Sequence, residues 1–404
     1  MKIGINTLLF SISQALDCVE NALLGVATNH SRRVACVSMR ICRRMGLSEA
    51  DVFDMGTCAV LHDNALTEYM QAVGPERCRR LENLDIHCAA GERNARDFPF
   101  QGRADGVVLH HHENWDGSGV HKLRGEAIPL RAAALRLADN VDARFSLGTA
   151  DPALPENVLA HVRRERERIY APETADVFLE LFGEDMLQDL SDERIDASLT
   201  EVMPPLEGEL SMPQLLRICR IFSGIIDAKS PFTKNHSQGI AEKTGYMASF
   251  YGMDAERRDM LGVAAHLHDL GKLSIPADIL EKPGSLSEEE FLVMRGHASM
   301  SWEILSGVAG MEDIALWAAG HHEKLDGTGY PFGRRAEELP FESRLLACVD
   351  IYQALTEERP YRAGMEHRRA MYILEGMAAH GKIDGDIVRK MGPALEHFSP
   401  EKCS

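Results

Sequence analysis

The C-terminal half of the chain carries seven residues of types that ligate divalent metals. They are His236, His268, Asp269, His297, His321, His322 and Asp350. Neutral imidazoles and carboxylates without thiolates suit iron(II) or manganese, with zinc and nickel as alternatives. Because five His and two Asp exceed the needs of one ion, the set predicts two ions that share a bridging carboxylate.

Two such ions would support phosphodiester hydrolysis. Placed about 3.5–4 Å apart, they lower the pKa of a bridging water, which reacts as hydroxide, and they polarise the phosphoryl oxygens. We expect His268 to bind one ion and the adjacent Asp269 to bridge both. Lys272 follows in a turn and adds a point cation near the phosphate. We therefore expect Asp269 and Lys272 to act in catalysis.

The same residue types recur once in the N-terminal half, in the same order. The counterparts are His30, His62, Asp63, His87, His111, His112 and Asp139. The offset between copies drifts only from 206, for His236 and His30, to 211, for Asp350 and Asp139. One repeat of this length indicates two homologous domains rather than a solenoid. The N-terminal residues are a candidate second metal site.

Helices are expected to carry both sets of ligands. Pro213, suited to a first helical turn, precedes an apolar pattern at helical spacing: Leu215, Ile218, Phe222, Ile225 and Ile226. Similar periodicity marks residues 257–270, 286–308, 311–322 and 342–357. Alternating β-branched runs are scarce. The predicted fold class is therefore all-α, with two tandem homologous helical domains.

The boundary between the domains is expected at an acidic segment that contains a Pro-Pro pair. Residues 191–210 have weak apolar periodicity, which is typical of a linker. We accordingly predict one domain over residues 1–200 and the second over residues 205–404.

Composition limits the partners and the compartment. The net charge of −18 disfavours a nucleic-acid polymer, although metals and a few cations can still attract a small anion. The sequence contains no run of about 18 apolar residues, so we expect no membrane span. The first residues also lack the features of a signal peptide. The nine cysteines are scattered without a CxxC pair. They predict buried thiols in the reducing cytoplasm rather than a disulfide framework.

The motifs resemble those of the HD-GYP subfamily of HD phosphohydrolases. The run from His268 to Lys272 resembles the HDxGK motif, and the run from His321 to Pro331 resembles HHExxDGxGYP. The resemblance extends over residues 211–395. Because several separate motifs occur in the family's order, it is highly specific.

This resemblance implies a metal-dependent phosphodiesterase with two HD-type helical domains. It implies hydrolysis of cyclic di-GMP to linear pGpG, GMP or both, while some members prefer 3′,3′-cyclic GMP-AMP. The seven C-terminal residues then correspond to the family's ligands for two divalent ions, iron or manganese. The family's phosphate- and base-contacting residues correspond to Lys272, Tyr330, Arg359 and Arg362. Some members bind a third metal through a Glu, where this chain has Phe232, so we expect two metals.

The N-terminal copy resembles a degenerate HD-GYP domain. Leu66 stands where Lys272 does, and Gly148 stands where Arg359 does. Val120 and His121 replace the Tyr-Pro of the GYP loop. The copy lacks the cations that hold a cyclic dinucleotide. We therefore expect a regulatory, dimerising or ligand-sensing role, through a homodimer or a signalling partner protein.

Two other functions remain open. One is a signalling adaptor that binds a cyclic dinucleotide or a partner protein without turnover, which the retained Lys272 and Tyr330 disfavour. The other is a different HD hydrolase that acts on nucleoside monophosphates or (p)ppGpp. The paired histidines and the GYP loop disfavour this second function.

Overall fold

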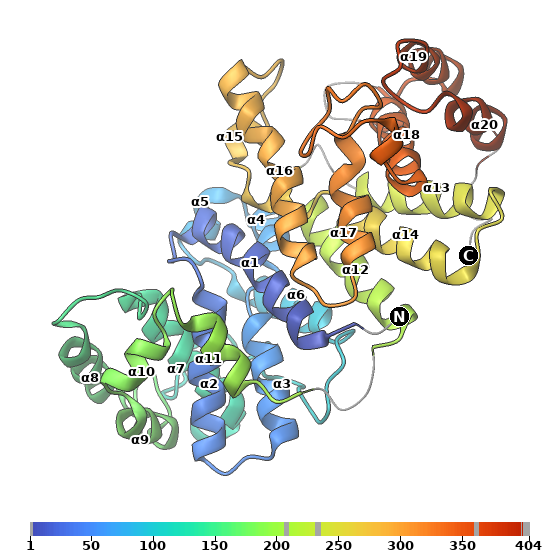
Figure 1. Ribbon diagram of the computed structural model, residues 1–404. Helices are drawn as coiled ribbons and strands as arrows, with labels where there is room; N and C mark the ends of the chain where they lie inside the picture. The colour runs from blue at the N-terminus through green and yellow to red at the C-terminus, as the bar shows by residue number, and fades with distance from the viewer. Residues whose placement is uncertain (1–2, 206–209, 231–235, 359–362, 397, 399–404) are drawn as a thin grey trace. The chain divides into compact units, whose positions relative to one another are not determined.

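The described part of the protein is helical. The computed structural model describes residues 3–205, 210–230, 236–358, 363–396 and 398, and this part contains helices, turns and loops without a strand (Figure 1). Contacts between Cα atoms divide the chain into two compact units, one spanning Gly4–Glu209 and the other beginning at Leu210. The predicted all-α class is confirmed.

The N-terminal unit, coloured blue to green in Figure 1, contains eleven described α-helices. They are α1 (Ile5–Leu24), α2 (His30–Arg44), α3 (Glu49–Val60), α4 (Leu66–Val73), α5 (Pro75–Arg79), α6 (Leu84–Ala95), α7 (Leu130–Phe145), α8 (Leu154–Glu165), α9 (Pro172–Leu181), α10 (Glu184–Asp189) and α11 (Ile195–Val202). A short 3-10 helix, η1 (Gly125–Ala127), precedes α7.

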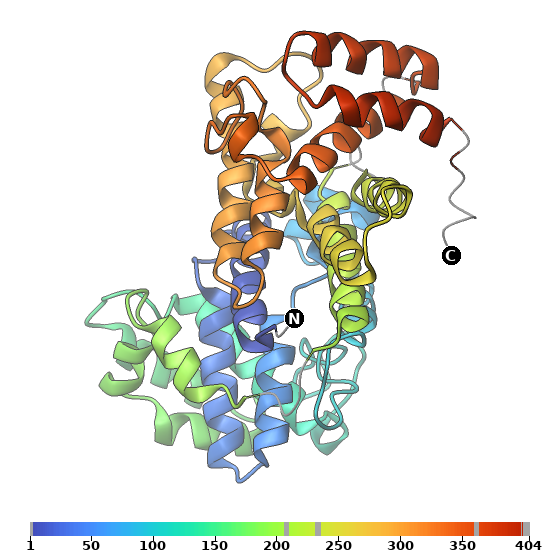
Figure 2. The same cartoon turned by 45° about the vertical axis from the view of Figure 1, so that its right-hand side comes forward.

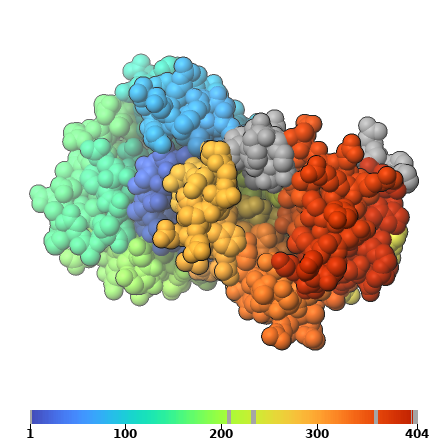
Figure 3. Space-filling view, turned by 90° about the horizontal axis from the view of Figure 1, so that it is seen from above, coloured from blue at the N-terminus to red at the C-terminus, as the bar shows by residue number. Residues whose placement is uncertain are grey.

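The C-terminal unit, coloured yellow to red, contains nine described α-helices. They are α12 (Met212–Asp227), α13 (His236–Phe250), α14 (Ala255–Leu267), α15 (Ala277–Leu280), α16 (Glu288–Ser306), α17 (Glu312–Ala319), α18 (Phe341–Thr356), α19 (His367–Ala379) and α20 (Gly385–Leu395). Three 3-10 segments are η2 (Leu270–Ser274), η3 (Gly320–His322) and η4 (Ala336–Glu338). Helices α19 and α20 lie side by side (Figure 2), and the orange and red parts of the unit form one continuous surface (Figure 3).

The two units repeat the same helix packing. In the N-terminal unit α2 packs against both α3 and α7, and in the C-terminal unit α13 packs against both α14 and α18. These are matching helices, because α2 and α13 each begin at the first histidine of their copy. The sequence repeat is therefore a repeat of structure.

Apolar periodicity and end caps explain why these segments are helical. The apolar residues predicted for α12, from Leu215 to Ile226, are all buried, and Pro213 lies in its first turn. Helix α16 begins with a capping box in which Ser287 and Glu290 satisfy each other's backbone N–H groups. The cap fixes the start of the helix that later carries His297.

The predicted linker differs from the structure in its central part. Residues Ile195–Val202 form α11, which packs against α2 within the N-terminal unit. Its four buried residues are Ile195, Ser198, Leu199 and Val202. Their spacing of three and four residues is helical, but the helix is only eight residues long, so the acidic flanks mask the pattern.

The described cysteines agree with the expectation of buried thiols. The eight described cysteines are free, and all except Cys18 are buried. None of the described helices combines the length and the hydropathy that crossing a bilayer requires.

The glycine of the HDxGK-like motif allows η2 to approach α16 closely. A Cβ atom on Gly271 would lie 2.0 Å from the carbonyl oxygen of His297, and the backbone N–H of Gly271 donates to Ser301 Oγ at 2.9 Å. We predict that Gly271→Ala forces the two segments apart and destabilises the protein by about 1–3 kcal/mol. Thermal unfolding measures this change.

Gly376→Ala is the matched control. Gly376 is exposed within α19, where an added Cβ meets no atom within 4 Å. The same exchange there should stabilise the protein by about 0.5–1 kcal/mol, because alanine favours a helix. Equal melting temperatures for the two variants would contradict the packing argument.

Candidate metal centres

All seven predicted C-terminal ligands converge on one buried site. His236 begins α13, His268 and Asp269 follow α14 directly, and His297 lies on α16. The paired histidines form the end of η3, and Asp350 lies on α18. Six of the seven side chains are buried; His322 is intermediate. Helix ends and helix faces far apart in sequence therefore supply one ligand set.

The two oxygens of Asp269 face different histidines. Oδ2 lies 3.2 Å from His268 Nε2 and 3.9 Å from His236 Nε2. Oδ1 lies 3.4 Å from His297 Nε2 and 3.7 Å from His321 Nε2. A carboxylate in this position can bridge two ions.

The remaining ligands fall into two groups on either side of Asp269. The first contains His236, His268 and Asp350, and the second contains His297, His321 and His322. Within each group the donor atoms lie within 4.8 Å of one another. Asp350 Oδ1 is 3.3 Å from His236 Nε2. Each group offers three donors to one ion, with the bridge as a fourth.

The histidine tautomers suit metal binding. In His268, His297 and His321, Nδ1 lies 2.5–2.8 Å from the carbonyl oxygen three residues earlier. Each Nδ1–H therefore donates to that carbonyl, and each Nε2 lone pair points into the centre. Among the described residues these Nε2 atoms and Asp269 Oδ1 have no hydrogen-bond partner. Two divalent cations would together satisfy these four atoms, so the residues fit the metals that the sequence predicts.

Electrostatics keep three of the ligands, His321, His322 and Asp269, in the protonation states that metals need. Burial lowers the pKa of His322 to about 3, and burial with the neighbouring His322 holds the pKa of His321 well below its usual value. Burial opposes the charge on Asp269, but His268 and Lys272 hold its pKa well below the usual range. Neutral imidazoles beside an ionised carboxylate are the metal-binding forms.

Two of the predicted substrate-binding residues lie at the centre. Lys272 Nζ is 2.5 Å from Asp269 Oδ2, and the ring of Tyr330 lies 4.8 Å from the ring of His322. Arg359 and Arg362 lie outside the described residues, as does Phe232.

Sequence reasoning missed Arg295 and Glu357. The Arg295 guanidinium lies 4.8 Å from the centre of the Tyr330 ring. Glu357 Oε2 is 2.8 Å from His236 Nδ1 and so orients that imidazole. In the sequence, Arg295 resembles many other charged residues of a protein surface. Only its position two residues before His297 sets it apart.

Glu323 holds the loop that contains Tyr330. Sequence left open whether it orients the site or forms a surface salt bridge. Its side chain is buried, and its carboxylate accepts from the backbone N–H groups of Phe332, Gly333 and Arg334 at 2.6–3.1 Å. These bonds favour the orienting role. Gly329 lets the loop turn back on this residue, because a Cβ there would lie 2.5 Å from Glu323 Cα.

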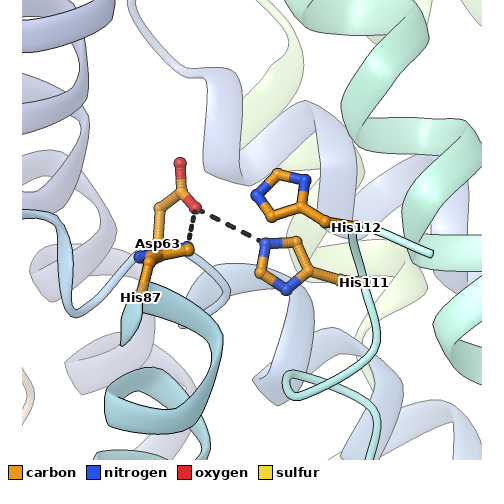
Figure 4. A group of neighbouring side chains, drawn as sticks. All are labelled: Asp63, His87, His111 and His112. Atoms are coloured by element: carbon orange, nitrogen blue, oxygen red, sulfur yellow. Dashed lines mark ion pairs between the residues drawn. The ribbon is translucent and has the colours of Figure 1, made fainter. Parts of the chain in front are cut away.

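The N-terminal residues form a second cluster of the same kind (Figure 4). Asp63 Oδ1 lies 3.0 Å from His87 Nε2 and 3.7 Å from His111 Nε2, and His112 belongs to the same group of donors. Figure 4 shows the three imidazoles and the carboxylate turned toward a common space.

The other N-terminal ligands lie beside this group. His30 and His62 approach Asp139 Oδ1 at 3.4 and 3.8 Å. All seven predicted N-terminal residues therefore come together. An eighth donor, Glu20, completes a group with His30 and His62, and burial raises its pKa to about 8. Sequence reasoning missed Glu20, because it is a single acidic residue with no counterpart in the other copy.

Comparison with known proteins identifies both copies as the same domain. Residues 28–144 and residues 220–387 each match the family described as "HD domain". The chain is similar to 3′3′-cGAMP-specific phosphodiesterase 1 of Vibrio cholerae, with 30% identity over 399 residues that cover 93% of this chain and 90% of the relative.

Two further relatives and one solved structure are also similar to this chain. 3′3′-cGAMP-specific phosphodiesterase 3 of Vibrio cholerae is 32% identical over 324 residues, covering 79% of this chain and 69% of the relative. The cyclic di-GMP phosphodiesterase response regulator RpfG of Xanthomonas campestris is 35% identical over 173 residues, covering 42% and 43%. The crystal structure of the Vibrio cholerae enzyme V-cGAP3 matches with a TM-score of 0.71 and 26% identity, covering 99% of this chain and 100% of that one.

The bridging position of Asp269 yields a direct prediction. Asp269→Asn preserves the size of the side chain and removes the charge that faces four imidazoles, so the C-terminal centre should lose its ions. Metal analysis of the purified protein measures this loss. Asp278→Asn, at an exposed position on α15, should leave the metal content unchanged. Retention of the full metal content by Asp269→Asn would refute the bridge.

Proposed function

The chain belongs to the HD-domain phosphodiesterases of the HD-GYP type, and from that membership we propose that its C-terminal domain hydrolyses 3′3′-cGAMP. Hydrolysis of a cyclic dinucleotide is the function of the protein. The choice of 3′3′-cGAMP over cyclic di-GMP rests on one observation. The relatives that match most of this chain, through both copies, are specific for 3′3′-cGAMP, whereas the cyclic di-GMP enzymes match less than half of it.

The C-terminal ligands would hold two divalent cations, with iron and manganese the proposed metals. When bound, such ions activate water as a nucleophile and stabilise charge on the phosphoryl oxygens. The residues of the chain supply the framework: His236, His268, Asp350 and Asp269 Oδ2 surround one position, and His297, His321, His322 and Asp269 Oδ1 surround the other.

Lys272 is proposed to bind the scissile phosphate. Its ammonium group lies beside Asp269 and is partly exposed, so it can contact both the ligand set and an incoming anion. A lysine in such a position neutralises phosphate charge as a point cation. The equivalent Leu66 of the N-terminal copy is buried and carries no charge. We propose on this basis that only the C-terminal domain hydrolyses the dinucleotide.

Tyr330 and Arg295 are proposed to form a wall for a nucleobase. The guanidinium covers the tyrosine ring, while the ring itself lies against His322. A planar base can stack on such a surface, and the guanidinium can donate to a base edge or to a phosphate. Arg359 and Arg362 remain additional phosphate contacts predicted from the family resemblance.

The substrate proposal is tested by a product assay with both dinucleotides. Protein purified without oxygen and loaded with Fe²⁺ or Mn²⁺ should cleave 3′3′-cGAMP with a kcat/KM roughly tenfold or more above that for cyclic di-GMP, which corresponds to about 1.4 kcal/mol. A preference for cyclic di-GMP would correct the substrate. Binding of both without turnover would identify a sensor instead of an enzyme.

The wall is tested by Arg295→Ala. Loss of the cation should raise KM by about tenfold and leave kcat within a few-fold, because the ligands of the centre are untouched. Lys390→Ala is the control, since Lys390 lies 4.7 Å from the ring centre of Tyr251, outside the centre. An unchanged KM for Arg295→Ala would remove this residue from the substrate site.

A further inference from the structure

Helix α1 extends further than α12, its counterpart in the C-terminal unit. The same contact ties both helices to the first histidine helix. Asp17 accepts from the backbone N–H and hydroxyl of Ser31 at 3.0 and 2.6 Å, and Asp227 accepts from those of Ser237 at 3.1 and 2.7 Å. Helix α12 ends at this aspartate, whereas α1 continues for seven residues to Leu24.

The added turns bring a carboxylate over the N-terminal centre. Glu20 lies three residues after Asp17, and hence on nearly the same face of α1. Its side chain is buried, and Oε1 lies 3.2 Å from His30 Nε2. In the C-terminal copy the residue three positions after Asp227 is Ser230, which lies beyond the end of α12 and carries no carboxylate.

Two carboxylate oxygens face the Nε2 atom of His30. Nδ1 lies 2.6 Å from Asp142 Oδ2 and donates to it, while Arg33 pairs with the other oxygen of Asp142 at 2.7 Å. The Nε2 atom of the neutral imidazole is then an acceptor. It faces Glu20 Oε1 at 3.2 Å and Asp139 Oδ1 at 3.4 Å. Three acceptors that converge in a buried space repel one another unless a proton or a metal ion lies between them.

Unsatisfied atoms and an open route support the same conclusion. Among the described residues, Glu20 Oε2, His30 Nε2 and His62 Nε2 have no hydrogen-bond partner. Leaving such a buried polar atom without a partner is unfavourable. A cavity of about 770 Å³ borders the centre and is lined in part by Glu20, Asp63, His87 and Asp139. An ion can therefore reach these ligands from solvent.

We propose that the N-terminal domain binds two divalent cations and that Glu20 is a ligand of one of them. One ion is held by Glu20, His30, His62 and Asp139, and the other by Asp63, His87, His111 and His112. The first site includes the carboxylates of Glu20 and Asp139, so it does not need Asp63 as a bridging ligand. This mixture of imidazoles and carboxylates suits manganese, iron(II) or zinc.

The test is Mn²⁺ binding to the full-length chain with its C-terminal centre disabled by Asp269→Ala and His321→Ala. Titration calorimetry and metal analysis should find two Mn²⁺ per chain. Adding Glu20→Gln should remove one ion or weaken its binding at least about tenfold. The conservative Glu20→Asp should recover part of the affinity. Because only Mn²⁺ is measured, the result does not depend on which dinucleotide is hydrolysed.

Asp17→Asn is the matched control. It makes the same kind of exchange at a buried carboxylate of α1 that binds Ser31. It should lower the melting temperature but leave Mn²⁺ stoichiometry and affinity unchanged. Equal losses from Asp17→Asn and Glu20→Gln would mean that α1 only supports the fold. Two results would refute the proposed Glu20 site: no Mn²⁺ bound by the chain that carries Asp269→Ala and His321→Ala, or an unchanged Mn²⁺ affinity in Glu20→Gln. In that case His30 would be doubly protonated between its carboxylates.

Discussion

A buried carboxylate surrounded by imidazoles is the constraint on which each half of this protein depends. Asp269 is 1% exposed, and an isolated charge at that depth would be strongly unfavourable. The ammonium group of Lys272 offsets part of this charge, and the surrounding imidazoles offer lone pairs to the cations that would neutralise the rest. Those imidazoles come from α13, α16 and the segments that follow α14 and α17. The packing of these helices therefore has to be maintained for the buried charge of Asp269 to be tolerated.

Helix ends provide the orientation that the centre needs. His268 and His321 each follow the last turn of a helix, where carbonyl oxygens lack an intrahelical partner, and each uses Nδ1–H to satisfy one of them. One hydrogen bond thus caps the helix and fixes the tautomer. His62 and His111 make the same bond in the N-terminal copy, which explains how the ligand geometry persists there without the substrate-binding groups.

Local patterns in the sequence predicted the helical fold, and they picked out residues that the structure brings together in two clusters. Apolar spacing defines α12, and adjacent pairs such as His268-Asp269 are conspicuous in any helical protein. Arg295 and Glu20 could not be found in this way. Their importance comes from side-chain contacts across the fold, with Tyr330 and His30 respectively, and neither residue type is unusual at its position. Helix α11 was missed for a different reason, since eight residues give too little periodicity to outweigh acidic neighbours.

The peptide bond between His322 and Glu323 joins two parts of the site mechanically. His322 faces the centre, while the next side chain anchors three consecutive amides of the loop beyond Tyr330. A rotation of the backbone at this junction cannot move the imidazole without also moving the anchored loop. A displacement of the His322 imidazole is therefore coupled to a displacement of the loop that carries Tyr330 and Phe332.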